Sequence, residues 1–272
     1  MTISNPVGLQ ALSALLSETT SVTVATDGVN FNGTELTNDL FVGNATSNTA
    51  RGNEGNDLFL GGDGDDLIFG DAGNDALFGE NGADQLRGGV GNDTIDGGVG
   101  NDLLVGDSGV DQLIGGEGAD QFAYAGDVFA NGIAAPAGKT GINVLNQPDV
   151  ISDFTIGEDQ FALNKFDLNL DTLTFQKGQS SQIAGNGNVI VLTDPFPAAG
   201  AAARAIANNN NITADAGAFI YFNSTLGLTR LAYSQDLGDG GNVSVLANLD
   251  NQRGEAGLAN VAQFSEANFT LV

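Results

Sequence analysis

Eight aspartates recur at intervals of nine residues in this 272-residue sequence. They are Asp57, Asp66, Asp75, Asp84, Asp93, Asp102, Asp111 and Asp120. Carboxylates are hard oxygen donors, which Ca²⁺ and Mg²⁺ prefer as ligands. A regular column of carboxylates therefore indicates either a segment that captures divalent cations or a self-repelling polyanion without a fold.

The residues between the aspartates decide between these two possibilities. Written in nines from Gly52, the segment is GNEGNDLFL, GGDGDDLIF, GDAGNDALF, GENGADQLR, GGVGNDTID, GGVGNDLLV, GDSGVDQLI and GGEGADQFA. Positions one and four are always Gly, position six is always Asp, and position eight is always Phe, Ile or Leu. A solvated acidic linker has no reason to carry a large apolar residue at every ninth position. The unbroken period instead predicts a solenoid, either built around metal or metal-free.

Each position of the repeat has a physical role in such a solenoid. The glycines permit tight turns, and the three residues after each Asp form a short strand whose middle side chain points inward. Where position two is not Gly it is Asn53, Asp71, Glu80 or Asp107. We expect a left-handed backbone at these four residues, which Asn and Asp tolerate best after Gly. Two turns return the chain over itself, so that one coil has 18 residues.

An 18-residue coil stacks alternate aspartates. Asp57, Asp75, Asp93 and Asp111 then follow one edge, and the other four follow the opposite edge. Neighbouring parallel strands lie about 4.8 Å apart and Ca²⁺ binds oxygen at about 2.4 Å, so an ion fits between carboxylates of successive coils. With turn carbonyls completing a shell of about six oxygens, the site suits Ca²⁺ better than Zn²⁺ or Mg²⁺.

The charge balance of the chain also favours calcium as the cofactor. The chain has 34 acidic and 8 basic residues, for a net charge of -26, which argues against nucleic acid as a partner. Within residues 52–123, Arg87 is the only basic residue. Because stacked carboxylates repel one another, we expect this segment to be disordered without calcium and to fold when calcium binds.

The composition also restricts the possible chemistry. The chain has neither Cys nor His, which removes disulfides, a Cys-based zinc site, an HExxH protease and a Ser-His-Asp triad. We therefore expect no enzymatic activity. The alternative is a calcium-dependent glycan-active enzyme, a lyase or epimerase, with paired carboxylates in residues 124–272. The sequence shows no apolar run of membrane-spanning length, and its first 50 residues contain no Lys or Arg for a standard N-terminal export signal.

The repeat resembles GGxGxDxUx, with U a large apolar residue, which is the nonapeptide of the RTX family of secreted bacterial proteins. Residues 149–159, DVISDFTIGED, are similar to the segment after the β-roll of serralysin-type proteases, and residues 218–249 are similar to C-terminal regions of RTX proteins. The resemblance implies a parallel β-roll and type I secretion with an uncleaved C-terminal signal, for which FSEANFTLV is the candidate. A last strand is the alternative interpretation of this tail.

The resemblance also implies a ligand set. In the family, each ion is held by the carbonyls of positions two and four and the Asp of one turn, and by the carbonyls of positions one and three and the Asp one coil later. The first site would comprise Asn53, Gly55, Asp57, Gly70, Ala72 and Asp75, and the array would hold about six ions. The implied metal positions are Asn53, Gly55, Asp57, Gly62, Gly64, Asp66, Gly70, Asp71, Ala72, Gly73, Asp75, Gly79, Glu80, Asn81, Gly82, Asp84, Gly88, Gly89, Val90, Gly91, Asp93, Gly97, Gly98, Val99, Gly100, Asp102, Gly106, Ser108, Asp111, Gly115, Glu117 and Asp120.

The predicted fold class is all-β, with three parts. An N-terminal cap covers residues 1–38, with a helix at 9–16 and a strand at 22–25. The parallel β-roll covers residues 39–123, because Asp39 lies 18 residues before Asp57. A β-rich domain covers residues 124–272, with strands at 150–154, 160–163, 173–175, 189–192, 219–222, 228–233 and 243–249 and a helix at 198–207. We expect a secreted structural or adhesive protein at a cell surface or in a matrix, with polysaccharide as a candidate partner.

Overall fold

The computed structural model describes residues 21–24, 30–35, 37–126, 128, 134–135, 144–209, 211–238 and 242–272. It divides into two compact units, Met1–Ala123 and Tyr124–Val272. The helix predicted at residues 9–16 lies outside the described residues. A strand is present at Ser21–Val24, close to the one predicted at residues 22–25.

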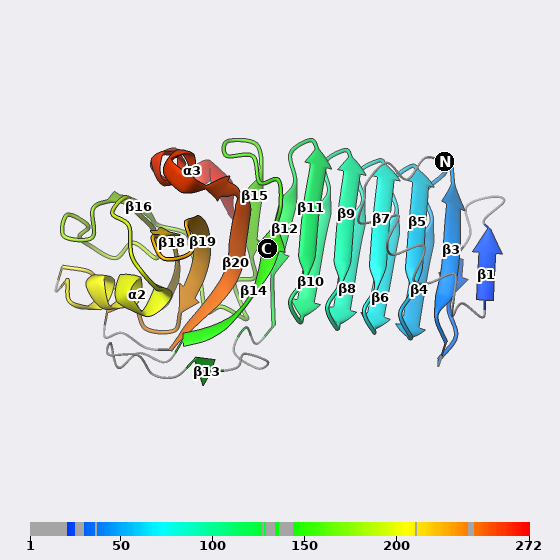
Figure 1. Cartoon of the computed structure of the whole chain (residues 1–272), viewed down its shortest axis with the longest axis horizontal. Coiled ribbons are helices and arrows are strands. Elements are labelled where there is room, and N and C mark those ends of the chain that lie inside the picture. The colour runs from blue at the N-terminus through cyan, green and yellow to red at the C-terminus, as the bar shows by residue number, and fades with distance from the viewer. Residues whose placement is uncertain are drawn as a thin grey trace. The chain divides into compact units, whose positions relative to one another are not determined.

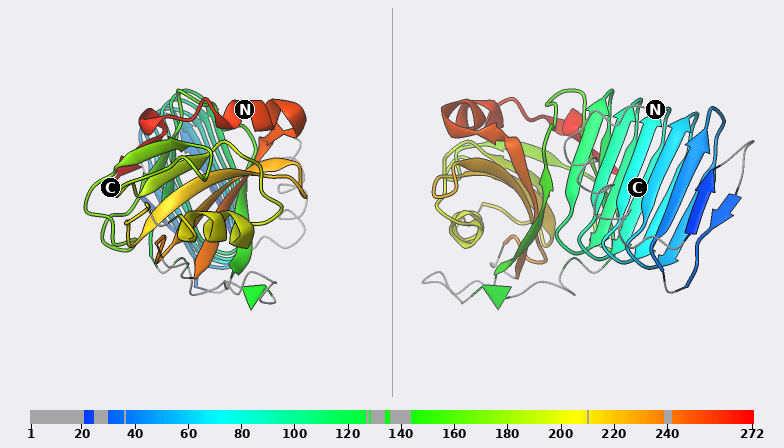
Figure 2. Two further views of the ribbon diagram at one scale, coloured as in Figure 1. Left: turned by 90° about the vertical axis from the view of Figure 1, so that its left-hand side faces the viewer. Right: turned by 45° about the vertical axis from the view of Figure 1, so that its right-hand side comes forward.

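The first unit is a roll of two parallel sheets (Figure 1, Figure 2). One sheet runs in the order β1 (Ser21–Val24), β3 (Asp39–Asn44), β5 (Leu58–Asp63), β7 (Ala76–Asn81), β9 (Thr94–Val99) and β11 (Gln112–Glu117). The other runs in the order β2 (Asn30–Asn32), β4 (Thr49–Glu54), β6 (Leu67–Ala72), β8 (Gln85–Val90), β10 (Leu103–Ser108) and β12 (Gln121–Tyr124). The chain alternates between the sheets, so each coil adds one strand to each of them.

The strand register confirms the 18-residue coil. Leu58 of β5 pairs with Ala76 of β7, and Leu67 of β6 pairs with Gln85 of β8. The regular strands have six residues and not the three that the sequence predicted. They continue into positions one to three of the next repeat because backbone pairing persists there, as between Gly62 and Glu80. The all-β parallel β-roll is therefore confirmed.

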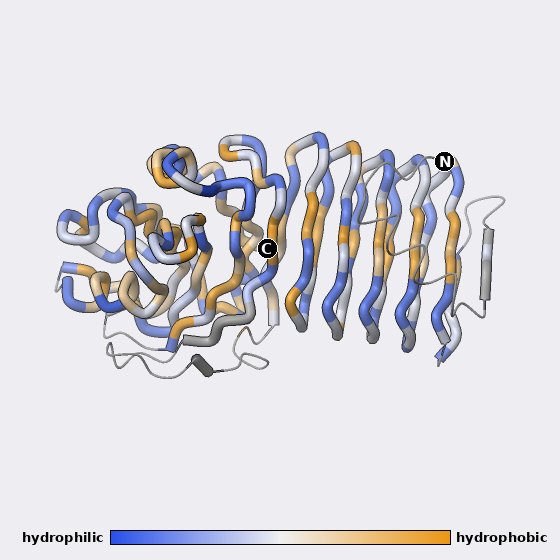
Figure 3. Tube along the Cα trace, viewed as in Figure 1, coloured by the Kyte–Doolittle hydropathy of each residue, from blue (hydrophilic) through white to orange (hydrophobic). Residues whose placement is uncertain are grey.

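The core of the roll consists of one inward side chain per repeat. The eight position-eight residues are at most 1% exposed, and they are Phe59, Ile68, Leu77, Leu86, Ile95, Leu104, Leu113 and Phe122. Figure 3 shows an apolar band in the middle of the roll's strands, between more hydrophilic turns. The rings of Phe31 and Phe41 lie 5.2 Å apart and continue this core into the irregular first coils.

A second apolar cluster lies on outward-pointing positions of β3, β5 and β7. It contains Leu40, Leu58, Leu60, Ala76 and Phe78, all at most 8% exposed. The middle residue of each strand points inward as predicted, but in these strands the outward residues are buried as well. These strands carry apolar residues at positions seven and nine, whereas β9 carries Thr94 and Asp96 there.

The second unit contains a sheet in the order β14 (Val144–Ile151), β20 (Val243–Arg253), β19 (Leu228–Ser234), β18 (Gly217–Asn223), β17 (Val189–Leu192) and β16 (Phe175–Gly178). A separate parallel pair joins β15 (Gln160–Leu163) to β21 (Phe269–Leu271). Helix α2 (Ala199–Ala207) packs its apolar face on the sheet, with Ala202 and Ile206 in one buried cluster with Phe219 and Tyr221.

Most predicted strands of this unit are present with shifted ends. Strand β14 begins at Val144 and not at residue 150, β16 begins at Phe175, and a short β13 (Ala134–Ala135) pairs with β14. The sequence did not predict helix α3 (Gly254–Val261) or the short 3₁₀ turn η1 (Glu266–Asn268). In the part of the chain that the structure describes, no helix combines the length and the apolar character needed to cross a membrane.

Candidate metal centre

The repeat aspartates are buried although each carries a carboxylate. All eight position-six aspartates, from Asp57 to Asp120, are at most 2% exposed. Each one ends a turn and precedes a strand, so its side chain folds back under the turn. A buried carboxylate is costly unless a cation or hydrogen-bond donors compensate its charge.

One oxygen of each carboxylate is bound to the protein backbone. Asp75 Oδ1 accepts a hydrogen bond of 2.7 Å from the amide of Asp57, one coil earlier, and Asp93 Oδ1 accepts one of 2.8 Å from the amide of Asp75. The opposite edge repeats the arrangement, since Asp84 Oδ1 accepts a 2.7 Å bond from the amide of Asp66. These bonds stack the carboxylates in two columns along the edges of the roll.

The second oxygen has no such partner. Among the described residues, no hydrogen-bond donor reaches the buried Oδ2 atom of Asp57, Asp66, Asp75, Asp84, Asp93 or Asp102. An unsatisfied, buried carboxylate oxygen that recurs at the same position of successive repeats indicates a ligand atom.

A carbonyl oxygen lies beside this free carboxylate oxygen. A Cβ atom placed on Gly52 would come within 2.1 Å of Asp57 Oδ2 and 2.5 Å of the carbonyl oxygen of Gly70, one coil later. We call this space beside a position-one glycine, between the carboxylate and carbonyl oxygens, the cradle. It is also present at Gly61, where a Cβ atom would lie 2.3 Å from Asp66 Oδ2 and 2.7 Å from the carbonyl oxygen of Gly79. Position one is therefore Gly because any side chain there would fill the space between the two oxygens.

The carbonyl oxygens of position three each accept one hydrogen bond and keep a second lone pair for another partner. The carbonyl oxygen of Ala72 accepts a 2.9 Å bond from the amide of Gly55, and that of Asn81 accepts a 2.8 Å bond from the amide of Gly64. A carbonyl oxygen has two lone pairs, so each of these can also face a cation. In the described chain, no three acidic side chains converge on one point. A metal here must therefore take most of its ligands from the backbone.

The electrostatics of the metal-free roll oppose ionisation. Burial raises the pKa of Asp57 to about 7, that of Asp75 to about 8 and that of Asp93 to about 7. The hydrogen bond from the backbone amide lowers each pKa, and neighbouring carboxylates raise it further. On the opposite edge, burial raises the pKa of Asp66 and that of Asp84 to about 6.

At each edge of the roll, the donor set thus consists of one carboxylate oxygen per coil and nearby backbone carbonyls. These are hard oxygen donors on a flexible turn, the combination that Ca²⁺ accepts and that the smaller Mg²⁺ and the nitrogen- and sulfur-preferring Zn²⁺ fit less well. The residues present therefore fit calcium.

A scan against protein-family models matches the RTX calcium-binding nonapeptide repeat in four copies, at residues 42–77, 69–104, 78–113 and 87–122. Residues 42–122 of the chain are RTX calcium-binding repeats. No curated protein sequence matches the chain. The family match covers the roll and leaves the second unit unassigned. Because RTX nonapeptide repeats bind Ca²⁺, calcium is the ion for which the two carboxylate columns are built.

The structure brings the RTX ligand positions of successive coils together. Asn53, Asp71, Glu80 and Asp107 have φ between 67° and 74°, as predicted for position two of the turn. This conformation places the carbonyls of positions one to three in the turn that also holds the aspartate. The stacking of Asp57 on Asp75 and of Asp66 on Asp84 follows the predicted 18-residue spacing.

The sequence reasoning missed one irregular turn that belongs to the RTX columns. Asn48 lies 18 residues before Asp66, and its amide donates a 2.6 Å bond to Asp66 Oδ1. A Cβ on Gly43 would lie 2.5 Å from Asn48 Oδ1, in the cradle described for Gly52. The available signal was Gly43, which lies nine residues before Gly52 and so continues position one of the repeat.

Proposed function

We propose that this RTX protein is a secreted, non-enzymatic calcium-binding protein whose roll folds when calcium binds, and that it acts as a structural or adhesive component outside the cell. The column of buried Oδ2 atoms without hydrogen-bond donors carries this proposal. Folding the roll without a cation leaves these oxygens desolvated at intervals of one coil. Ca²⁺ supplies the missing positive charge, so binding and folding become one process.

The ligand set proposed for each ion is the one that the resemblance implies. For the first ion it is Asn53, Gly55 and Asp57 on one coil and Gly70, Ala72 and Asp75 on the next. The proximity of Asp57 Oδ2 to the Gly70 carbonyl oxygen supports this pairing of coils. Repeating it along both columns gives six sandwiched ions.

Folding that depends on calcium is compatible with export of the protein from the cell. Extracellular calcium modules bind with dissociation constants of about 10⁻⁴ to 10⁻³ M, far above cytosolic calcium, so such a roll stays unfolded before export and folds afterwards. The residues proposed to form the C-terminal β domain, 124–272, would then provide the segment read by a type I secretion system, with FSEANFTLV at its end.

The test of folding is circular dichroism during a calcium titration of the full chain. The spectrum in chelator should combine the β signal of the second unit with a disordered contribution from the roll. An increase in β signal when calcium is added supports the proposal. Magnesium at the same concentration serves as a control. A roll signal that is already complete in chelator overturns the calcium switch.

The alternative function is a calcium-dependent lyase or epimerase acting through residues 124–272. It is tested by incubating the calcium-loaded protein with acidic polysaccharides and measuring unsaturated products and the ratio of uronate epimers. Turnover that disappears with chelator would replace the non-enzymatic proposal. Complete absence of both products supports it.

A further inference from the structure

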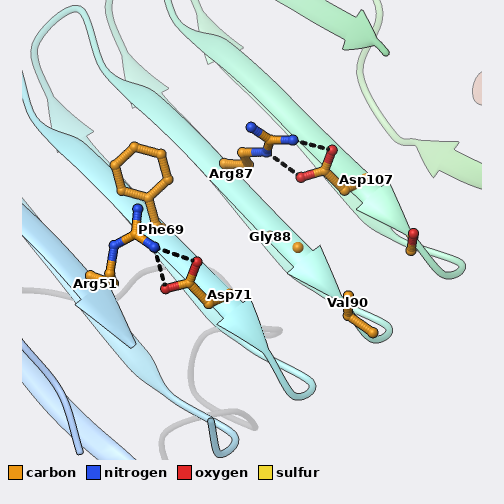
Figure 4. A pocket seen from close by; sticks show the side chains of 9 residues that line it. Arg51, Phe69, Asp71, Arg87, Gly88, Val90 and Asp107 are labelled. Atoms are coloured by element: carbon orange, nitrogen blue, oxygen red, sulfur yellow. Dashed lines mark hydrogen bonds and ion pairs between the residues drawn. The ribbon is translucent and has the colours of Figure 1, made fainter. Parts of the chain in front are cut away.

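A shallow groove of about 420 Å³ lies on the outer face of the sheet that contains β4, β6, β8 and β10 (Figure 4). It adjoins the calcium columns, because Asp71, Gly88, Gly89, Val90 and Ser108 also belong to the positions that the RTX resemblance assigns to calcium. Gly88 and Gly89 of β8 form its floor. Side chains of β4 and β6 line one side, and side chains of β10 line the other. Position two of the repeat is Asp71 on β6, Gly89 on β8 and Asp107 on β10. Because Gly89 has no side chain, it leaves a gap between the two acidic residues.

Two matched ion pairs flank this gap. Arg51 Nη1 donates to both carboxylate oxygens of Asp71, at 2.9 and 3.2 Å. Arg87 also contacts both carboxylate oxygens of Asp107 but uses two nitrogens, since Nε donates to Oδ2 and Nη2 donates a 2.9 Å bond to Oδ1. The pairs are 36 residues apart, which is two coils, so they lie about 10 Å apart along the sheet.

An aromatic ring occupies the strand between the two arginines. Phe69 pairs in register with Arg51 on one side and with Arg87 on the other. The Arg51 guanidinium lies 4.7 Å from the centre of the half-buried Phe69 ring. Figure 4 shows the ring and this guanidinium on one side of Gly88, with Arg87 and Asp107 on the other.

The chemistry of the groove restricts its ligand. Each ion pair uses only part of the five N–H donors of a guanidinium, and each carboxylate oxygen can accept a further hydrogen bond. The arginine side chains are about half exposed, at 47% and 54%. The groove thus offers paired donors and acceptors beside a flat apolar ring, with no net charge of its own. An anionic ligand would meet both carboxylates and a chain with a net charge of -26.

We propose that this groove binds a neutral, β-linked glycan that runs along the roll across the strands. A sugar ring has an apolar face that packs on Phe69 and hydroxyl groups that both donate and accept hydrogen bonds. The two-coil spacing of the Arg–Asp pairs matches a ligand whose disaccharide unit repeats along its length. This inference deepens the proposed adhesive role and rests on it, since the groove exists only on the folded roll.

The test is isothermal titration of the full calcium-loaded chain with neutral hexasaccharides of β-linked glucose, mannose and xylose, and with the β-linked glucuronate hexasaccharide. At least one neutral hexasaccharide binds, and the glucuronate binds more weakly. Phe69→Ala reduces the affinity about tenfold, whereas Ile114→Ala, an outward position on the opposite sheet, leaves it unchanged. Tighter binding of glucuronate, or equal losses in both variants, overturns the proposal.

A charge variant tests the role of the ion pairs. Asp107→Asn leaves Arg87 without its counter-charge, so we expect binding of the glucuronate hexasaccharide to increase about tenfold relative to the parent chain. Calcium content and circular dichroism are measured on the same samples. A protein that takes up calcium and folds but binds no hexasaccharide refutes the groove while leaving the calcium switch intact. A protein that never folds with calcium refutes the proposed function itself.

Discussion

Asp75 Oδ1 accepts a 2.7 Å hydrogen bond from the amide of Asp57, while its Oδ2 is buried without a hydrogen-bond donor among the described residues. The two oxygens of one carboxylate therefore have different roles. Oδ1 holds adjacent coils in register, and Oδ2 is left for a cation. Asp57, Asp66, Asp84, Asp93 and Asp102 repeat this division, so the cost of a missing cation accumulates along the stack.

Loss of an internal aspartate should remove more calcium than loss of one near the start of its column. Asp93 is bonded to the coils of both Asp75 and Asp111, whereas Asp66 follows Asn48, whose amide side chain carries no charge. We expect Asp93→Ala to lose two ions and Asp66→Ala to lose one. Native mass spectrometry of both variants counts the ions. Equal losses would contradict the sandwich geometry.

A side chain at position one should weaken calcium binding although the backbone carbonyl of that residue is kept. A Cβ on Gly70 would lie 2.3 Å from Asp75 Oδ2 and 2.6 Å from the carbonyl oxygen of Gly88. We expect Gly70→Ala to raise the calcium concentration at the folding midpoint about tenfold or more. Gly178→Ala is the matched control, because a Cβ there meets only ordinary contacts at 3.8 Å and beyond. A midpoint that is the same for both variants and the parent chain would show that the cradle holds no ion.

The metal-free roll should be more stable in acid than at neutral pH. The pKa of Asp75 is raised by burial to about 8, and that of Asp57 to about 7, from the ordinary value of 3.8. Groups with a raised pKa contribute stability to the folded state that is fully present below about pH 4 and is lost as the pH rises toward 8. Circular dichroism of calcium-depleted protein should show β structure increasing from pH 8 to pH 5.

Calcium binding should respond to pH in the opposite direction, because the metal needs the deprotonated carboxylates. Over the same interval, the calcium affinity should therefore rise from pH 5 to pH 8. An affinity that is independent of pH in this range would show that the buried aspartates are not the ligands.

The inward phenylalanines should matter to the calcium-loaded state. Phe59 is fully buried, and truncating such a side chain costs about 3–5 kcal/mol. We expect Phe59→Ala to lower the melting temperature of the calcium-loaded roll strongly. Phe166→Ala, at an 80% exposed position, is the control and should leave it unchanged. Similar melting temperatures for the two variants would contradict the assigned core.

The repeat was predictable from sequence because each of its positions answers a local requirement. Phe59 and Phe122 fill the interior, Asp57 and Asp75 stack because the coil has 18 residues, and Asn53 takes the left-handed conformation that its turn needs. The nine-residue period therefore suffices to predict the parallel β-roll and its two carboxylate columns.

Features that depend on tertiary contact could not be predicted in this way. Leu60 and Phe78 occupy outward positions, and only the folded structure shows them buried together. The groove beside Arg87 arises because Gly89 separates two acidic side chains from different coils. Helix α3 (Gly254–Val261) carries two glycines and a weak apolar pattern, so its formation depends on packing and not on local preference.

Small-angle X-ray scattering of the full chain, before and after exhaustive removal of calcium at neutral pH, tests the central claim most directly. With calcium we expect a compact particle. Without it we expect a marked increase in the radius of gyration, because residues 52–123 become an extended polyanion attached to a folded second unit. Equally compact particles in both conditions would contradict a roll that needs calcium to fold.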